Sequence, residues 1–75
     1  MSVQFVKSAG ADDDQKVVKL GPFHKVVAVT DNVVVTMEGD AITGGNDITF
    51  TKMLEIEETM EKVTVSNGTV AIYTY

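Results

Sequence analysis

Carboxylate side chains come closest to forming a metal-binding or reactive cluster in this sequence. Three consecutive aspartates, Asp12, Asp13 and Asp14, offer oxygen ligands of the kind that Ca²⁺ and Mg²⁺ prefer. The run lacks the alternate-residue spacing and the bidentate glutamate of a calcium loop. Because adjacent negative charges repel one another, we interpret the run as a solvated loop and expect no metal ligand there.

A second acidic group contains Glu55, Glu57, Glu58 and Glu61. Paired carboxylates can hydrolyse glycosidic bonds, but that chemistry needs a cleft with aromatic platforms. The chain has three Phe, two Tyr and no Trp. We therefore interpret these glutamates as solvated charges that protect a strand from edge-to-edge aggregation.

The remaining residues that could do chemistry are isolated. His24 is the one imidazole, and a general base needs a nucleophile and an orienting carboxylate beside it. The sequence has no Cys and no Gly-x-Ser-x-Gly elbow, and Gly44-Gly45 lacks the Lys-Ser/Thr pair of a phosphate loop. We expect no catalytic residue, no cofactor-binding residue and no enzyme.

Length and composition predict a single β domain over residues 1–75. Val, Thr and Ile make up more than a third of the chain, which is typical of strands. The net charge is −5, with six Lys and no Arg, which argues against nucleic acid or an anionic membrane as the partner. No apolar run approaches the ~20 residues of a membrane span, and the N-terminus lacks a signal-peptide pattern. We expect a soluble protein, intracellular or in a virion, and not secreted by a signal peptide.

The stretch 25–38, KVVAVTDNVVVTME, dominates the hydrophobic pattern. Asp31-Asn32 suits a two-residue turn, so the pattern predicts a central β-hairpin in which Thr30 faces Val33. Alternation places Val27, Val29, Val34 and Thr36 on one face and Val26, Ala28, Val33, Val35 and Met37 on the other. Both faces are largely apolar, so each must be covered by a second sheet, a helix or another chain.

A second hairpin is predicted at Asn67-Gly68, the strongest short turn signal in the chain. Its pairing would place Val65 opposite Val70 and gather four apolar residues on one face, namely Val63, Val65, Val70 and Ile72.

Shorter strands are predicted around these two hairpins. They cover 2–7, 16–20 with Val18 and Leu20 as the inward pair, and 48–53 with Ile48 and Phe50 on one face. Gly21-Pro22 should end the second of them. Loop 39–47 should be anchored to the core by Ile42. Residues 54–56 favour a strand followed by a turn at 57–59, and one short helix near 53–61 is the alternative.

Together these segments predict an all-β fold. The architecture is a small antiparallel sandwich or a partly closed barrel of six to seven short strands.

The functional hypothesis is a structural or assembly protein that self-associates or docks on a larger protein. A chain this small has no disulfide to stabilise it, and its central hairpin has two dry faces. The interface candidates are Val26, Val33, Val35, Met37, Tyr73 and Tyr75. A virion accessory component, such as a capsid cement or a head–tail protein, is one concrete case.

The alternative hypothesis is a small β-barrel that binds a ligand or nucleic acid. Such a barrel would need a concave site lined by Phe5, Phe23, Phe50 or Tyr73, with basic residues nearby.

Overall fold

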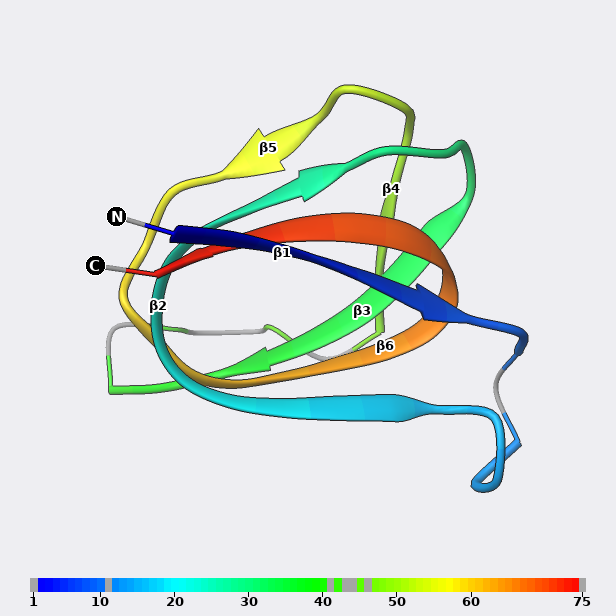
Figure 1. Cartoon of the computed structure of the whole chain (residues 1–75), viewed down its shortest axis with the longest axis horizontal. Coiled ribbons are helices and arrows are strands. Elements are labelled where there is room, and N and C mark those ends of the chain that lie inside the picture. Colours follow the sequence, from blue (N-terminus) through cyan, green and yellow to red (C-terminus); the bar gives the residue numbers. More distant parts are fainter. Residues whose placement is uncertain (1, 11, 41, 43–44, 46, 75) are drawn as a thin grey trace.

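The fold is built around one long C-terminal strand, seen in the computed structural model of the chain (Figure 1). Residues 2–10, 12–40, 42, 45 and 47–74 are described. They form six strands and contain no helix: β1 (Ser2–Ser8), β2 (Val17–Ala28), β3 (Val33–Glu38), β4 (Ile48–Phe50), β5 (Glu55–Ile56) and β6 (Met60–Thr74). The all-β prediction of a partly closed barrel is confirmed, and the helix considered near 53–61 is absent from the described residues.

Strand β6 has neighbours along both of its edges. In its first half, Val65 pairs with Val17 of β2 on one side and with Val35 of β3 on the other. In its second half, Ala71 lies between Phe5 of β1 and Val27 of β2. The backbone of β6 is therefore shielded on both sides, as expected for the central strand of a sheet.

The N-terminal half of the chain passes β6 twice, each time in the antiparallel direction. On the first pass, β1 pairs with residues 68–74 of β6, and residues 17–20 of β2 pair with residues 62–65. In both pairings the residue numbers rise along one strand as they fall along the other. On the second pass, residues 25–28 of β2 pair with 70–73, and β3 continues along 62–67. Strand β4 extends the sheet beyond β3, and β5 extends it beyond β2.

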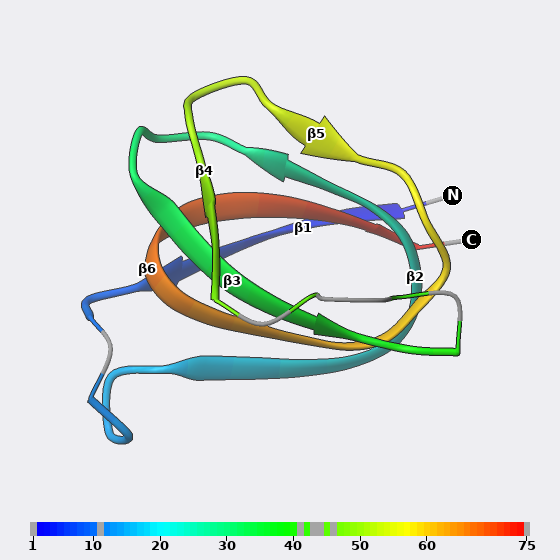
Figure 2. The same ribbon diagram turned by 180° about the vertical axis from the view of Figure 1, so that it is seen from behind.

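Curvature of β2 and β6 nearly closes the sheet into a barrel. Phe23 pairs with both Met60 and Thr74, so the two ends of β6 meet the same point of β2. The views from the front and from behind show β6 as a wide arc facing the curve of β2 (Figures 1 and 2).

The barrel interior holds one apolar cluster. Its members have at most 3% of their surface exposed: Val6, Phe23, Val26, Ala28, Val33, Val35, Met37, Phe50, Met60, Val63, Val65, Val70 and Ile72. Ile42 and Ile48 pack against this cluster, and Phe50 is fully buried. The predicted anchoring of loop 39–47 by Ile42 and the shared face of Ile48 and Phe50 are therefore confirmed. Burial at about 25 cal/mol per Å² of apolar surface makes this cluster the main source of stability.

The predicted C-terminal hairpin at Asn67-Gly68 is wrong. Gly68 does adopt a left-handed backbone, with φ of 82°, but β6 continues through it as one strand. Ser66 forms a bulge just before it, because Val34 pairs with Asn67 while Val35 pairs with Val65. Bulge and glycine together bend the strand, and the two halves pair with other strands instead of with each other.

The predicted central hairpin is also wrong. Residues 31–32 do form a turn, with a φ of 58° at Asn32, but β2 and β3 pair with β6 and not with each other. The turn packs on the bend of β6: Asn67 Nδ2 donates to the Asn32 carbonyl (2.8 Å), and the Thr69 N–H donates to Thr30 Oγ1 (3.0 Å). These contacts satisfy the carbonyl of Asn32 in the turn and the N–H of Thr69 in β6.

The second predicted strand runs further than expected. Strand β2 passes through Gly21-Pro22, a cis peptide, and residues 21–22 have no ladder partner, so the missing N–H of Pro22 costs no hydrogen bond. The inward pair is corrected too. Val18 and Leu20 point outward, 49% and 75% exposed, whereas Val17 packs against the core.

We predict that Gly68→Val destabilises the fold by roughly 2–5 kcal/mol, because the left-handed φ and the crowding both oppose a branched side chain. A Cβ at this position would lie 2.8 Å from both Thr30 Oγ1 and Val33 Cγ2. Urea unfolding followed by circular dichroism measures the change. The matched control is Gly10→Val, where the new side chain meets the end of the flexible Gln15 side chain. Equal unfolding midpoints for the two variants would contradict our account of the bend.

Candidate functional site

The predicted interface residues do not form a common surface. Val26, Val33 and Val35 are fully buried and Met37 is 3% exposed, all inside the barrel. Their proposed place at an interface is corrected, because the second half of the chain already covers them. Tyr73 is half-buried on the outside of β6, and Tyr75 lies outside the described residues.

Large apolar side chains are exposed at the margins of the sheet instead. They are Val3, Phe5, Val18, Leu20, Met53 and Leu54. Val3 and Phe5 belong to β1, Val18 and Leu20 to the first part of β2, and the other two precede β5. Phe5 is 69% exposed although a phenyl ring normally contributes to a core or an interface.

Strand β1 has a free backbone edge. Within the described residues it pairs with β6 alone, over seven registered positions from Ser2–Thr74 to Ser8–Gly68. Its outward residues Val3, Phe5 and Lys7 are exposed, whereas Val6 and Ser8 point inward and are buried. The Ser8 hydroxyl lies 2.8 Å from the Gln15 carbonyl and 2.9 Å from the Gly10 carbonyl, which fixes the end of β1 to the following loop.

The outer surface beside β1 combines an aromatic ring with a cation. Tyr73 pairs with Val3 across the sheet, and Lys25 Nζ lies 4.7 Å from the centroid of the Tyr73 ring. The ring centroids of His24 and Tyr73 are 6.3 Å apart. Lys25 also approaches Glu55 at 4.0 Å, so the charge of this ammonium is partly balanced within the chain.

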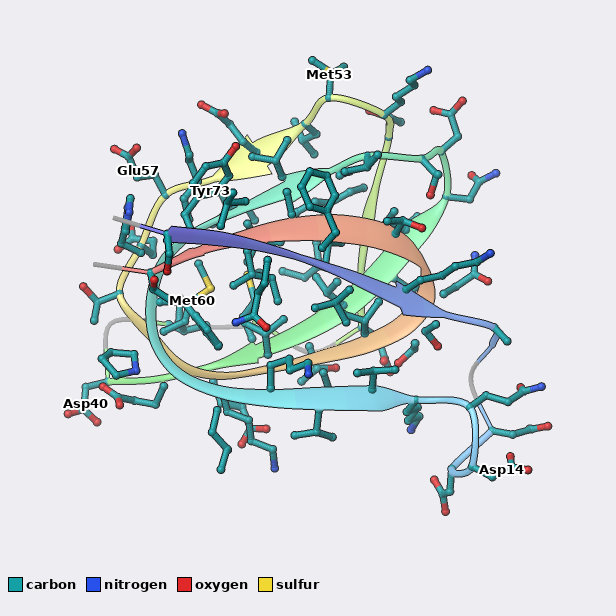
Figure 3. The ribbon with its side chains drawn as sticks, viewed as in Figure 1. Asp14, Asp40, Met53, Glu57, Met60 and Tyr73 are labelled. Atoms are coloured by element: carbon teal, nitrogen blue, oxygen red, sulfur yellow. The ribbon has the colours of Figure 1, made fainter. Side chains whose placement is uncertain are left out.

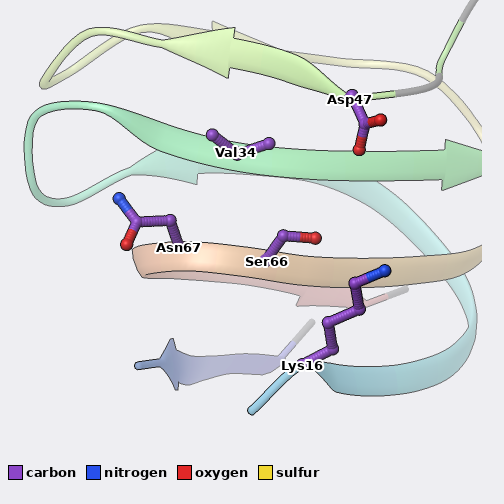
Figure 4. Close-up of a pocket in the computed structure, with 5 residues that line it drawn as sticks. All are labelled: Lys16, Val34, Asp47, Ser66 and Asn67. Carbon is purple, nitrogen blue, oxygen red and sulfur yellow. The ribbon is translucent and has the colours of Figure 1, made fainter. Parts of the chain in front are cut away.

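A pocket of about 370 Å³ lies on the outside of the other half of the barrel (Figure 4). Its lining residues are Lys16, Val34, Asp47, Ser66 and Asn67. The chain itself engages much of this polar lining, because Lys16 lies 3.9 Å from Asp13 and Asn67 donates to the Asn32 carbonyl. The pocket can accept a small polar molecule, but its lining side chains also have structural roles.

A second, more open pocket of about 410 Å³ contains the one histidine. Its lining residues are His24, Glu57, Glu58 and Thr59. Within the described part of the chain, no group of three or more His, Asp or Glu side chains is arranged to hold a metal ion.

Comparisons with protein-family models, with curated proteins and with solved structures found no match to this chain. A separate search for membrane-spanning helices found none in residues 2–10, 12–40, 42, 45 and 47–74.

The exposure of the outer residues of β1 and β2 was not predicted from the sequence. The alternation in 2–7 was visible, but alternation gives the two faces of a strand and leaves open which face meets the core. A usable signal was the scarcity of charge in Ser2–Ser8, where Lys7 is the one charged residue. Edge strands usually carry several charges, so an uncharged exposed edge indicates a contact surface.

We predict that Val35→Ala lowers the free energy of unfolding by about 2 kcal/mol, because it removes two buried methyl groups and leaves a cavity. Phe5→Thr should change it by no more than about 0.5 kcal/mol, because that ring is exposed and Thr retains strand propensity. Urea unfolding at low protein concentration measures both variants. A larger loss for Phe5→Thr than for Val35→Ala would show that the core and the surface are wrongly assigned.

Proposed function

We propose that this chain is a structural protein that works by associating with other protein surfaces, either copies of itself or a larger protein assembly. The observation that carries the proposal is the exposure of Phe5 on β1, a strand with one free edge in the described structure. The valines of 25–38 no longer support it, because the chain buries their inner face by itself.

Three strands have a single neighbour along their whole length within the described residues, and they differ in how well they resist pairing with other chains. Strand β4 has three residues, and β5 has two, of which one is Glu55, and is followed by Glu57 and Glu58; natural sheets use short, charged edges of this kind to prevent association. Strand β1 has seven residues, one charge, no Pro and no Gly. An edge of this kind is suited to contact with another protein.

The size of the molecule also bears on the proposal. Its accessible surface is 4391 Å². A standard interface buries about 800 Å² per partner, roughly a fifth of that total. A contact of that size would therefore involve a large share of the surface.

The specific case that we propose is an accessory component of a virion, such as a capsid cement or a head–tail protein. A small β domain whose edge strand can contact another protein is suited to repeated use in a large assembly. The proposed location is accordingly a virion or the cell interior.

The second candidate is a barrel that binds a ligand or nucleic acid. One observation favours it: Phe5, Tyr73, Lys7 and Lys25 share the outer face of β1, β6 and β2. Exposed rings interleaved with lysines can stack on bases. Phe23 and Phe50, however, lie in the core, and the net charge of −5 opposes a phosphate backbone.

Sedimentation equilibrium tests the proposal. We expect the mass to rise above the 8.1 kDa of a single chain between about 1 μM and 1 mM. Phe5→Thr should weaken this association roughly fivefold or more, because it removes an exposed aromatic contact while the fold is retained.

The matched control is Thr49→Ser, an exposed position on β4 away from β1. A folded single chain at every concentration would contradict self-association. Binding of a single-stranded oligonucleotide that weakens as salt is added would favour the second candidate instead.

A further inference from the structure

Strand β1 has a row of backbone groups that no other strand of the chain uses. Its seven residues pair with β6 from Ser2–Thr74 to Ser8–Gly68 and, among the described strands, with no other. Successive residues of a strand direct their N–H and C=O groups to opposite sides, so about half of these groups in β1 point away from β6. They form a free row, roughly 23 Å long, that another strand can join.

The other free edges of the described chain are too short to fill this row. Strand β4 has three residues and β5 has two. The first part of β2, residues 17–20, pairs with β6 alone and offers four positions. Contact between β1 and any of these edges would leave much of the row unpaired. Among the surfaces of this chain, the edge that matches β1 along its whole length is therefore β1 of a second copy.

Two β1 strands have one antiparallel register that uses all seven residues. Phe5 then lies opposite its own counterpart, and Val3 lies opposite Lys7. Because paired residues of an antiparallel ladder share a face, these exposed side chains meet on the outer face, while Gln4 meets Val6 on the inner face. The resulting contact has two-fold symmetry, so the same surface serves both copies.

The charge pattern of β1 is compatible with this register. Lys7 is the one charged residue of Ser2–Ser8, and it faces Val3 instead of its own counterpart, so no like charges lie directly opposite. The carboxylates next in the sequence are those of 12–14, and Figure 3 shows Asp14 at the far tip of the loop that follows β1. Two chains that each carry a net charge of −5 can therefore meet without a carboxylate in either contacting strand.

Apolar side chains continue across the same contact. On the outer face of the sheet, Phe5 lies beside Ala71 of β6, which lies beside Val27 of β2. Val3 lies beside Tyr73, which Figure 3 shows near the first part of β1. In the two-fold arrangement this face continues into the same face of the second copy. The Phe5 ring, 69% exposed in the single chain, then packs against its counterpart.

The size of this contact predicts weak association. One edge strand of seven residues gives a contact at the small end of protein interfaces, below about 1,200 Å² in total. The joined row adds roughly six to eight backbone hydrogen bonds. We therefore expect a dissociation constant between about 1 μM and 1 mM.

We infer that two copies of this chain form a two-fold dimer in which their β1 strands pair in the antiparallel direction, with Phe5 at the symmetry axis. The inference rests on the proposed function and names its partner as a second copy. The two sheets become continuous across the contact, because the free backbone groups of one β1 bond to those of the other. A contact of this kind is closed, so association of the isolated chain stops at the dimer.

Disulfide formation between single introduced cysteines tests the register, because the chain has no Cys of its own. In a mixture of Val3→Cys and Lys7→Cys, the two thiols face each other, and the paired Cα atoms are about 4.5–5.5 Å apart, within disulfide range. Two Val3→Cys chains instead hold their thiols four positions apart, roughly 13 Å. In a glutathione buffer, the mixed disulfide should form roughly fivefold or more faster than either symmetric disulfide, as measured by mass spectrometry.

The matched control is Leu20→Cys, an exposed apolar position on β2 outside the contact. When it is mixed with Val3→Cys, the three disulfides should form in statistical proportion. A fast symmetric disulfide of Val3→Cys would place the two Val3 residues together and would overturn the antiparallel register.

A lysine at the symmetry axis tests the same contact without cysteine chemistry. Phe5→Lys places two ammonium groups opposite each other and should weaken association roughly fivefold or more in sedimentation equilibrium. Leu20→Lys makes the same charge change at a side chain that is 75% exposed, and it should associate at least as well as the unmodified chain. The mass of the unmodified chain should level off at twice 8.1 kDa. Circular dichroism establishes that every variant is folded.

The outcomes separate this inference from the proposed function. If the unmodified chain associates but the mixed disulfide has no preference, or Phe5→Lys associates equally well, the β1 pairing is overturned while association itself stands. A folded chain that stays single at every concentration overturns the dimer and leaves β1 to a strand of a different protein, which is the other form of the proposed function.

Discussion

The structure depends on a single strand that is bent and paired along both edges. Strand β6 reaches from Met60 to Thr74, and its two ends meet β2 at Phe23. This arrangement requires a left-handed backbone at Gly68 and space for the turn that contains Thr30. If β6 were straight, the apolar faces of its two halves could not enclose one core.

The bend of β6 also explains which strands are available for contact with another protein. Because β6 pairs along both of its edges, the free edges within the described residues lie on other strands, among them β1, β4 and β5. Two of them are short, and β5 contains Glu55 and is followed by two more glutamates. Strand β1 is longer, nearly uncharged and carries an exposed Phe5. The proposed association follows from this difference between edges, because unpaired backbone groups and apolar side chains coincide on one strand.

The residue pattern of a strand determines which residues share a face, but it does not determine which strand pairs with it. The division of 25–38 into two faces is confirmed, because Val26 and Val35 are buried while Val27 and Val34 are half-buried. The face that contains Val63, Val65, Val70 and Ile72 is confirmed as well. Alternation determines these faces through the two-residue period of a strand, whichever strand lies alongside. Four of the six interface candidates, Val26, Val33, Val35 and Met37, are buried inside the barrel, because the chain itself supplies their cover.

By itself, the sequence determined the all-β class, the inward residues of most strands and the positions of the turn at Asp31-Asn32 and the left-handed residue Gly68. It could do so because these features depend on residue type and on neighbours in the chain. Only the tertiary structure decided which strands pair. The hairpin at 31–32 fails because β6 offers a longer partner to β2 and to β3, and the hairpin at 67–68 fails because the two halves of β6 pair with β1, β2 and β3 instead of with each other. Burying one shared core outweighs closing two short local turns. The same competition decided that β1 keeps a free edge.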